Sequence, residues 1–174
     1  IMALILHLQP VDFEKMSLPL GAWILFRLLA SFCGVFGFSV MFNSPVRLAA
    51  VAAGIGAVAN TFRLELVDLT ACPPAAAAFM GALAAGLLAS LIKSRVGYPR
   101  ISVTVPSIVI MVPGLYLYRG FYNLGMMSLS ASASWFASAI LIVAALPLGL
   151  IFARILTDKT FRYLSLIHIS EPTR

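Results

Sequence analysis

The chain has 174 residues, of which 61% are hydrophobic and 10% are charged, and its mean hydropathy is +1.02. A soluble domain carries about 25% charged residues, so this composition excludes a domain with a water-covered surface. The net charge of +6 does not indicate nucleic-acid binding, because the basic residues are dispersed between apolar blocks rather than gathered on one face. Apolar blocks of roughly 20 residues cross a bilayer as helices. The sequence therefore predicts an all-α membrane protein, a bundle of about five transmembrane helices.

The two ends of the chain are expected to lie outside this bundle. Residues 1–17 join a short apolar start, either the end of an earlier helix or an interfacial piece, to a polar joint. Residues 164–174 read LSLIHISEPTR, which resembles the translation of a sequencing adaptor, so we expect this tail to be non-native. The predicted membrane module covers residues 18–163. The sequence does not establish where the native chain begins and ends.

Two spans are predicted in the first half of the chain. The first lies at 19–42, with Trp23 as an anchor at the membrane interface. A short joint separates it from the second span, at 46–62, which is rich in Ala, Val and Gly. A polar joint is expected to follow, with the charged residues Arg63, Glu65 and Asp68.

Three further spans are predicted at 73–92, 101–118 and 135–156. The first of these opens with two prolines, which a helix tolerates in its first turn. Small residues at four-residue spacing in the second and third spans indicate close helix packing within the membrane. They are Ala52, Gly56 and Asn60 in the second span, and Ala78, Ala82, Gly86 and Ser90 in the third.

Basic residues in the short loops set the expected orientation, because such residues gather on the cytoplasmic side. With five alternating spans, one side receives Arg47, Lys93, Arg95, Arg100, Arg154, Lys159 and Arg162, and the other receives Lys15, Arg63 and Arg119. The first side is therefore assigned to the cytoplasm. We expect the N-terminus outside and the C-terminus in the cytoplasm, in a bacterial inner membrane.

The sequence contains no recognisable catalytic or metal-binding constellation. We expect the native carboxylates to lie in joints rather than inside spans, and they are Asp12, Glu14, Glu65, Asp68 and Asp158. No nucleophile with a base at membrane depth, no cluster with metal-ligand spacing and no phosphate-binding loop is visible. The sequence therefore predicts no enzyme, no cofactor and no bound metal.

The fourth span is the strongest candidate for function, because Pro106 and Pro113 remove backbone donors and Gly114 permits a break. Transporters bind substrates at such broken helices, whose free backbone groups face the ligand. An ordinary proline kink is the alternative. The candidate substrate-binding residues are Thr104, Pro106, Ser107, Pro113, Gly114, Tyr116, Arg119 and Arg27.

Several candidates have a second interpretation. Arg119 either neutralises an acidic substrate or extends to the interface from a helix end. Arg27 lies inside the first span, where a guanidinium is costly unless it meets water or an anion. Tyr116 is either an interfacial aromatic or a substrate contact. Glu65 and Asp68 are expected in a solvated loop, with a gating role as the alternative.

Two motifs resemble those of a known family. The joint Phe42-Asn43-Ser44-Pro45-Val46-Arg47 precedes an Ala/Gly-rich helix, and the fourth span combines Pro106 with Pro113-Gly114. Together they resemble the second membrane module of the threonine/serine exporter family, over about residues 20–163. The resemblance implies a subunit or half of a secondary exporter of small hydrophilic metabolites, either threonine and serine or dicarboxylates such as succinate. It also implies a partner, the first module of the exporter, as a separate subunit or a missing N-terminal half.

A non-transporting scaffold or assembly subunit of a transporter complex is the alternative function, and a homo-oligomer is also open. The two functions differ in whether the partner module transports at full rate without this chain. An intramembrane enzyme would need polar residues that these spans do not contain. Neither the substrate, the coupling ion nor the stoichiometry follows from the sequence.

Overall fold

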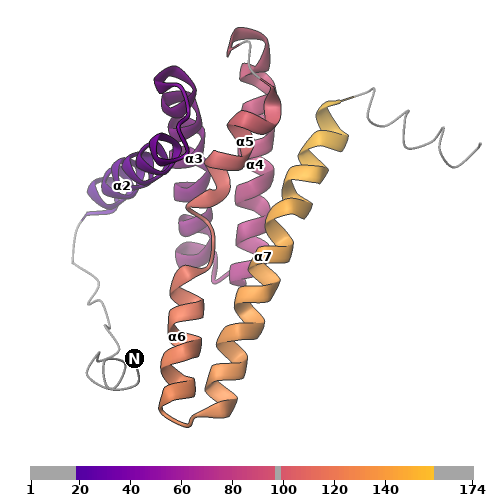
Figure 1. Cartoon of the computed structure of the whole chain (residues 1–174). Helices are drawn as coiled ribbons and strands as arrows, with labels where there is room; N and C mark the ends of the chain where they lie inside the picture. Colours follow the sequence, from indigo (N-terminus) through magenta and orange to yellow (C-terminus); the bar gives the residue numbers. More distant parts are fainter. Residues whose placement is uncertain (1–18, 97–98, 159–174) are drawn as a thin grey trace, which may run out of the picture.

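The computed structural model describes residues 19–96 and 99–158, and for 93–96 the backbone alone. Within these residues the chain is helical, as the sequence predicted (Figure 1). The helices are α2 (Leu20–Met41), α3 (Val46–Thr70), α4 (Pro74–Val96), α5 (Arg100–Val109), α6 (Gly114–Gly125) and α7 (Leu129–Thr157). The predictions made for residues 1–17 and 164–174 lie outside the described residues.

Four of these helices are long and apolar enough to cross a membrane: α2, α3, α4 and α7. The pair α5 and α6 adds a fifth if the two count as one bent span. Large apolar side chains such as Leu25, Phe26 and Leu29 of α2 are 54–60% exposed. Such exposure suits a chain whose solvent is lipid, because hydrocarbon solvates leucine as well as a neighbouring helix does.

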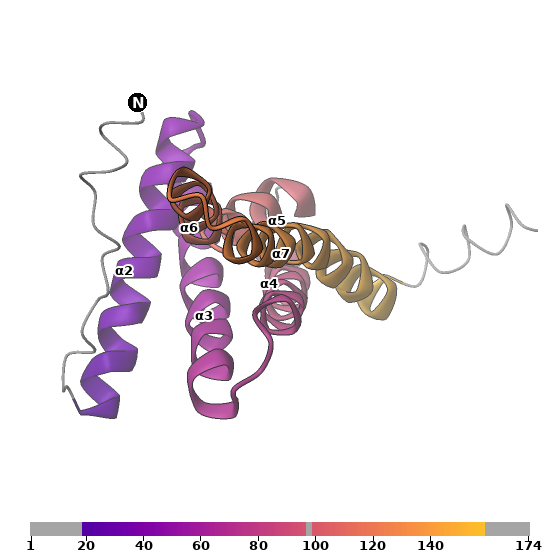
Figure 2. The same cartoon turned by 90° about the horizontal axis from the view of Figure 1, so that it is seen from below.

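Helices α2 and α3 form an antiparallel hairpin whose ends follow from the joint between them. Asn43 has φ 57°, in the left-handed region that asparagine tolerates better than most residues. Pro45 stands before the first residue of α3, where its fixed φ favours a helix start. The first predicted span therefore ends where the sequence placed it. Figure 2 shows α2 and α3 side by side, inclined to α4 and α6.

The predicted end of the second span at residue 62 was wrong. Helix α3 continues to Thr70, so Arg63, Glu65 and Asp68 lie on a helix and not in a joint. The extension contains arginine, leucine and glutamate, which are good helix formers, and no glycine or proline. Ala71 ends the helix in the left-handed conformation, with φ 49°.

The predicted start of the last span at residue 135 was also wrong, because α7 begins at Leu129. The serines before residue 135 favoured a joint in the sequence. In the structure the Ser134 hydroxyl donates to the Ser130 carbonyl at 3.0 Å, and the Ser138 hydroxyl donates to the Ser134 carbonyl at 2.9 Å. A serine that satisfies its hydroxyl in this way is compatible with a membrane helix.

The predicted fourth span is a broken helix. Helices α5 and α6 are bent by 40° relative to each other, and residues 110–113 separate them. The Met111 amide donates to the Ile108 carbonyl at 2.9 Å, which tightens the last turn of α5. Pro113 has no amide hydrogen, so it cannot continue the helical ladder. Helix α6 then pairs with the first half of α7 at the lower end of Figure 1.

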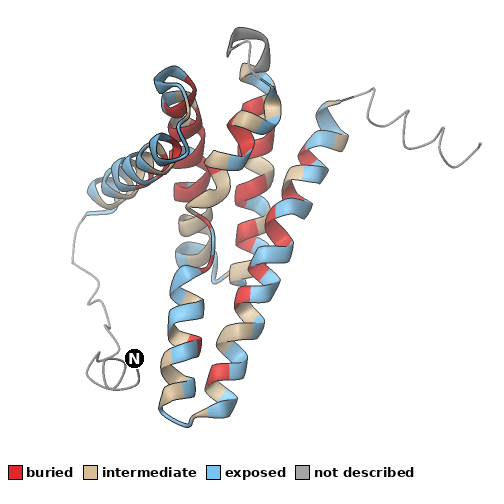
Figure 3. Cartoon of the chain, viewed as in Figure 1, coloured by how far each residue is buried: buried red, intermediate tan, exposed pale blue. Residues whose placement is uncertain are grey.

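Among the described glycines, those at the interface of α4 with the second half of α7 have the closest neighbours. A Cβ added at Gly149 would lie 2.5 Å from the Phe79 carbonyl oxygen, and one added at Gly86 would lie 2.5 Å from the Ala153 Cβ. Ala82 and Ala153 are both fully buried at this interface, and Figure 3 shows buried residues in red along both helices. The small-residue pattern of the third span thus predicted a real interface.

Helix α3 packs between α2 and α5 and completes the core. A Cβ added at Gly56 would lie 2.7 Å from the Ser107 carbonyl oxygen, so the backbones of α3 and α5 nearly touch. The Ser107 hydroxyl lies 3.0 Å from the Ala52 carbonyl oxygen and 2.7 Å from the Val103 carbonyl oxygen. This serine therefore links α5 to α3 and also bonds to the preceding turn of its own helix.

Candidate functional site

Polar groups lie near the middle of α2 and of α3 and in the break between α5 and α6. Ser31 lies near the middle of α2, Asn60 near the middle of α3, and Met111 in the break between α5 and α6. Ser31 and Asn60 are 3% and 4% exposed, and the Asn60 Nδ2 donates to the Ser31 Oγ at 2.9 Å. Substrate sites of secondary transporters are built at this depth from broken helices.

Arg63 of α3 is the residue that reaches the helix break. Its Nη1 donates to the Met111 carbonyl oxygen at 3.1 Å. Helix α4 closes this region, because a Cβ added at Gly81 would lie 3.0 Å from the Arg63 Cβ and 3.2 Å from the Met111 Sδ. A carbonyl freed by a break in a membrane helix needs a donor from its surroundings, and Arg63 supplies it.

The same region contains buried polar atoms that lack partners among the described residues. They are the Asn60 Oδ1, the Thr61 Oγ1 and the Arg63 Nε. Leaving a buried donor or acceptor unpaired costs about 1–3 kcal/mol. Asn60 and Arg63 lie three residues apart on one face of α3, whereas Thr61 is turned about 160° away from Arg63 around the helix axis. The Asn60 amide oxygen and the Arg63 guanidinium therefore form a polar patch that a small polar ligand would satisfy. We call Asn60, Arg63 and the Met111 carbonyl the break site.

An ion pair joins α2 to α3 close to the break site. The Arg27 guanidinium contacts the Glu65 carboxylate at 2.8 Å and also the Asp68 carboxylate. The Arg27 guanidinium additionally lies 4.9 Å from the centre of the Trp23 ring, a cation–π contact. The sequence analysis expected a guanidinium inside the first span to need water or an anion. The two carboxylates of α3 supply that anion.

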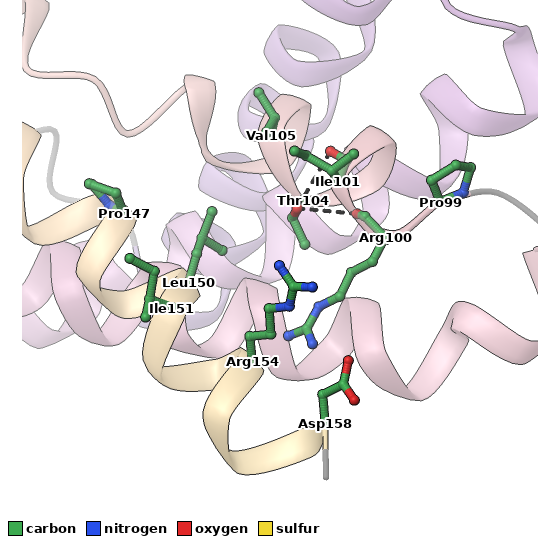
Figure 4. A pocket seen from close by; sticks show the side chains of 10 residues that line it. All are labelled: Pro99, Arg100, Ile101, Thr104, Val105, Pro147, Leu150, Ile151, Arg154 and Asp158. Atoms are coloured by element: carbon green, nitrogen blue, oxygen red, sulfur yellow. Dashed lines mark hydrogen bonds between the residues drawn. The ribbon is translucent and has the colours of Figure 1, made fainter. Parts of the chain in front are cut away.

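A pocket of about 550 Å³ lies between the start of α5 and the end of α7 (Figure 4). Its charged and hydroxyl-bearing lining residues are Arg100, Thr104, Arg154 and Asp158. The Arg100 Nη1 donates to the Thr157 Oγ1 at 2.9 Å, and its Nη2 donates to the Gly86 carbonyl at 2.9 Å. Two hydrogen bonds thus fix the Arg100 guanidinium in the pocket wall.

The structure separates the predicted site residues of α5. Thr104 is buried and lines the pocket beside Arg100. Pro106 instead lines a largely apolar hollow of about 650 Å³ between α5 and the joint before α3. Ser107 is fully buried against α3 and holds the two helices together.

The predicted residues of the break and of α6 lie in other surroundings. Pro113 is buried at the break, whereas Gly114 is exposed, and a Cβ there would meet nothing within 4 Å. Tyr116 packs on the core and its ring centre lies 5.6 Å from that of Trp135. The Arg119 guanidinium lies 4.8 Å from the centre of the same Trp135 ring. The eight predicted residues therefore do not form one cluster.

Reasoning from the sequence missed Arg63 as a candidate site residue, and treated Asn60 only as a small packing residue. The signal was present, because Asn60 and Arg63 are three residues apart and share a helix face once the helix continues past residue 62. Placing the helix end too early hid this relation. The contact between Arg63 and the Met111 carbonyl was not foreseeable, since it joins residues 48 positions apart.

The chemical groups of the two regions suit binding by charge and hydrogen bonding. Among the described residues no group of three or more His, Cys, Asp or Glu side chains could hold a metal ion. The break site offers a guanidinium, an amide and a backbone carbonyl, and the pocket offers guanidinium groups, a hydroxyl and a carboxylate. Both arrangements suit reversible binding of a small polar molecule with a carboxylate.

Comparison with known proteins agrees with the two sequence motifs. The family model described as Threonine/Serine exporter, ThrE matches residues 27–156, well over half of the 174 residues. This is a family of transporters and not of enzymes. No curated protein and no solved structure gives a match.

Proposed function

Because the chain belongs to the threonine/serine exporter family, we propose that it forms one membrane subunit, or one half, of a secondary exporter of threonine and serine. The family match gives no support to a dicarboxylate such as succinate, so the proposal is confined to these amino acids. The proposed location is a bacterial inner membrane, with the N-terminus outside and the C-terminus in the cytoplasm. The proposed partner is the first module of the exporter.

The contact between Arg63 and the Met111 carbonyl carries this proposal. It places a buried guanidinium against the broken helix near the centre of the molecule. Threonine and serine each carry a carboxylate, an ammonium group and a hydroxyl. The Arg63 guanidinium binds the carboxylate, while the Met111 carbonyl and the Asn60 Oδ1 accept hydrogen bonds from the ammonium group.

The ion pair of Arg27 with Glu65 and Asp68 supports a role for the proton gradient. These carboxylates lie on a helix long enough to span the membrane. Ionisable side chains within spans commonly mark ion or proton pathways.

The test is amino-acid efflux from vesicles that contain this chain and the first module. Replacing Arg63 by leucine (Arg63→Leu) removes both the carboxylate-binding group and the donor to Met111, so we expect threonine efflux to fall at least tenfold. A charge-assisted hydrogen bond contributes about 1.5–3 kcal/mol, which corresponds to about 10- to 100-fold. The matched control is Arg47→Leu, which removes a charge from an exposed position at the start of α3 and keeps efflux near the original rate.

A second variant tests the broken helix itself. Replacing Pro113-Gly114 by Leu-Ala restores an amide donor, so the ladder between α5 and α6 closes and efflux is lost. Efflux that both Arg63→Leu and this double substitution leave unchanged would contradict the role of the break site. Full efflux from the first module alone would instead identify this chain as a scaffold or assembly subunit.

A further inference from the structure

The pocket between α5 and α7 carries charges of both signs and lies apart from the break site. It is formed by the first residues of α5 and the last turns of α7, whereas the break site joins α3 to the segment that follows α5. None of the residues that line the pocket belongs to the break site. Its volume of about 550 Å³ falls within the usual range for small-molecule sites, about 300–1,000 Å³.

The positive part of the pocket is built from two arginines on different helices. Arg100 opens α5 and Arg154 lies in the last turn of α7, and Figure 4 shows both guanidinium groups on the same side of the pocket. Arg100 interacts electrostatically with both Arg154 and Asp158. Asp158 offsets part of the repulsion between the two guanidinium groups, and a ligand carboxylate placed between them offsets more of it.

The Arg100 guanidinium is held in place before any ligand arrives. Its bonds to the Gly86 carbonyl and the Thr157 hydroxyl leave other N–H groups of the guanidinium to donate, since it has five. Gly86 is itself fixed by the close approach of α4 to α7. A binding group that is ordered in advance loses less entropy on binding than a flexible one.

The rest of the pocket lining provides a carboxylate, a hydroxyl and apolar side chains. Asp158, at the end of α7, adds a carboxylate to the lining. The Thr104 hydroxyl donates to the Arg100 carbonyl at 3.1 Å, so its oxygen lone pairs are able to accept a further hydrogen bond. Apolar side chains such as Ile101, Val105 and Ile151 form the rest of the wall, which suits a methyl group.

We infer that this pocket is a second binding site, a loading site for a zwitterionic amino acid with a β-hydroxyl group. The ligand's carboxylate binds Arg100 and Arg154, its ammonium group binds Asp158, and its hydroxyl donates to Thr104. The site lies at the end of the bundle whose basic residues assign it to the cytoplasm. This inference rests on the proposed export function and adds the place where the substrate first binds.

Binding by the unaltered chain provides the first test. The full chain is placed in nanodiscs of phosphatidylcholine, and binding of radiolabelled L-threonine is competed with three analogues. Threonine amide lacks the carboxylate, 3-hydroxybutyrate lacks the ammonium group and 2-aminobutyrate lacks the hydroxyl. We expect the first two to compete at least tenfold less well than threonine and the third about threefold to tenfold less well. Equal competition by threonine amide, or no binding of threonine, would overturn the inference.

Variants then assign each charge to its partner group. Arg154→Gln is expected to weaken threonine binding about tenfold and to leave threonine amide unaffected. Asp158→Asn is expected to weaken threonine binding and to leave 3-hydroxybutyrate unaffected. Arg47→Gln removes a charge from the same end of the bundle but outside the pocket, and is expected to change neither. Arg154→Lys keeps the charge and is expected to restore most of the affinity.

An anionic lipid headgroup offers the same chemistry as a carboxylate, so the source is tested separately. The binding measurements are repeated in nanodiscs that contain phosphatidylglycerol. If Arg154→Gln alters binding of this lipid and leaves threonine affinity unchanged in both lipids, the pocket is a lipid site and the inference fails. Vesicle efflux distinguishes the two proposals. Threonine binding without efflux refutes the export function alone, and efflux with unchanged KM in Arg154→Gln refutes the loading site alone.

Discussion

The interface between α4 and α7 and the interface between α2 and α3 differ in the kind of contact that forms them. Helix α4 meets α7 through glycine and alanine, at distances that leave no room for a larger side chain. Helix α3 meets α2 through Asn60 with Ser31 and through Glu65 with Arg27. The first interface consists mainly of van der Waals contact, whereas the second combines an apolar cluster of Val35, Ala52 and Ala53 with these polar pairs and with an Asn60 Oδ1 that has no partner among the described residues.

In the proposed exporter, the α4–α7 interface holds the helices together and the α2–α3 side contributes to substrate binding. Close packing of small residues is the ordinary source of helix association in lipid. Buried polar groups with incomplete hydrogen bonding weaken an interface unless a ligand or partner completes them. The α4–α7 interface is therefore expected to respond to changes in volume, and the α2–α3 interface to changes in polarity.

The largest expected effect is a loss of folded protein when the α4–α7 interface is overfilled. Gly149→Leu places a side chain where even a Cβ would lie 2.5 Å from the Phe79 carbonyl oxygen. We expect a loss of about 3 kcal/mol or more in stability, because backbone and not a flexible side chain stands in the way. The measurement is the fraction of monodisperse protein in detergent after graded heating.

The control for this substitution is Gly37→Leu in α2, where an added Cβ meets nothing within 4 Å. It makes the same chemical change on a lipid-facing position and is expected to leave thermal stability nearly unchanged. Equal losses in the two variants would show that glycine itself, rather than close helix packing, determines stability.

At the α2–α3 interface we expect a smaller effect on stability and a larger effect on efflux. Asn60→Leu removes an unpaired buried oxygen together with the hydrogen bond to Ser31, so the two terms offset and stability changes by no more than about 1 kcal/mol. Threonine efflux is expected to fall about tenfold, because the site loses its amide. Thermal stability and efflux are measured on the same preparation. A large loss of stability with normal efflux would mean that Asn60 only holds the helices together.

The smallest expected effect lies outside both interfaces, at the end of α3. Ala71 is exposed and has φ 49°, where glycine is the better residue because it has no Cβ. Ala71→Gly should therefore stabilise the protein by about 0.5–1 kcal/mol, seen as a higher midpoint of thermal unfolding. Ala50→Gly, at an exposed position within α3, should have the opposite sign, about 1 kcal/mol of loss.

Much of the architecture could be predicted from the sequence, because lipid makes helix location a local property. Each unpaired backbone group in hydrocarbon is costly, so a long apolar block has little alternative to a helix. The turn at Asn43 and the break before Pro113 were visible as local features for the same reason. The end of α3 and the start of α7 were misplaced, since polarity was taken to end a helix. Instead, Arg63 donates to the Met111 carbonyl and Ser134 donates to the Ser130 carbonyl within the fold.

The candidate site was predictable only in part. The sequence pointed to the broken span, and Met111, Pro113 and Thr104 of that segment do lie at the break or in a pocket. It did not point to Arg63. Tyr116 and Arg119 are accounted for by their contacts with Trp135, although the sequence placed them in the same candidate group.

By itself the sequence determined that this chain is a helical membrane protein of the exporter family, and which of its helices is broken. Composition, proline positions and two short motifs are enough for those conclusions, because each acts within one helix or one joint. The tertiary structure alone decided which polar groups meet. Arg27 finds Glu65 and Asp68, and Arg63 finds the Met111 carbonyl, through contacts between residues 38–48 positions apart. Such contacts depend on how the helices cross and on how closely they approach. The small residues between the helices permit a close approach, but the sequence of one segment does not determine the crossing.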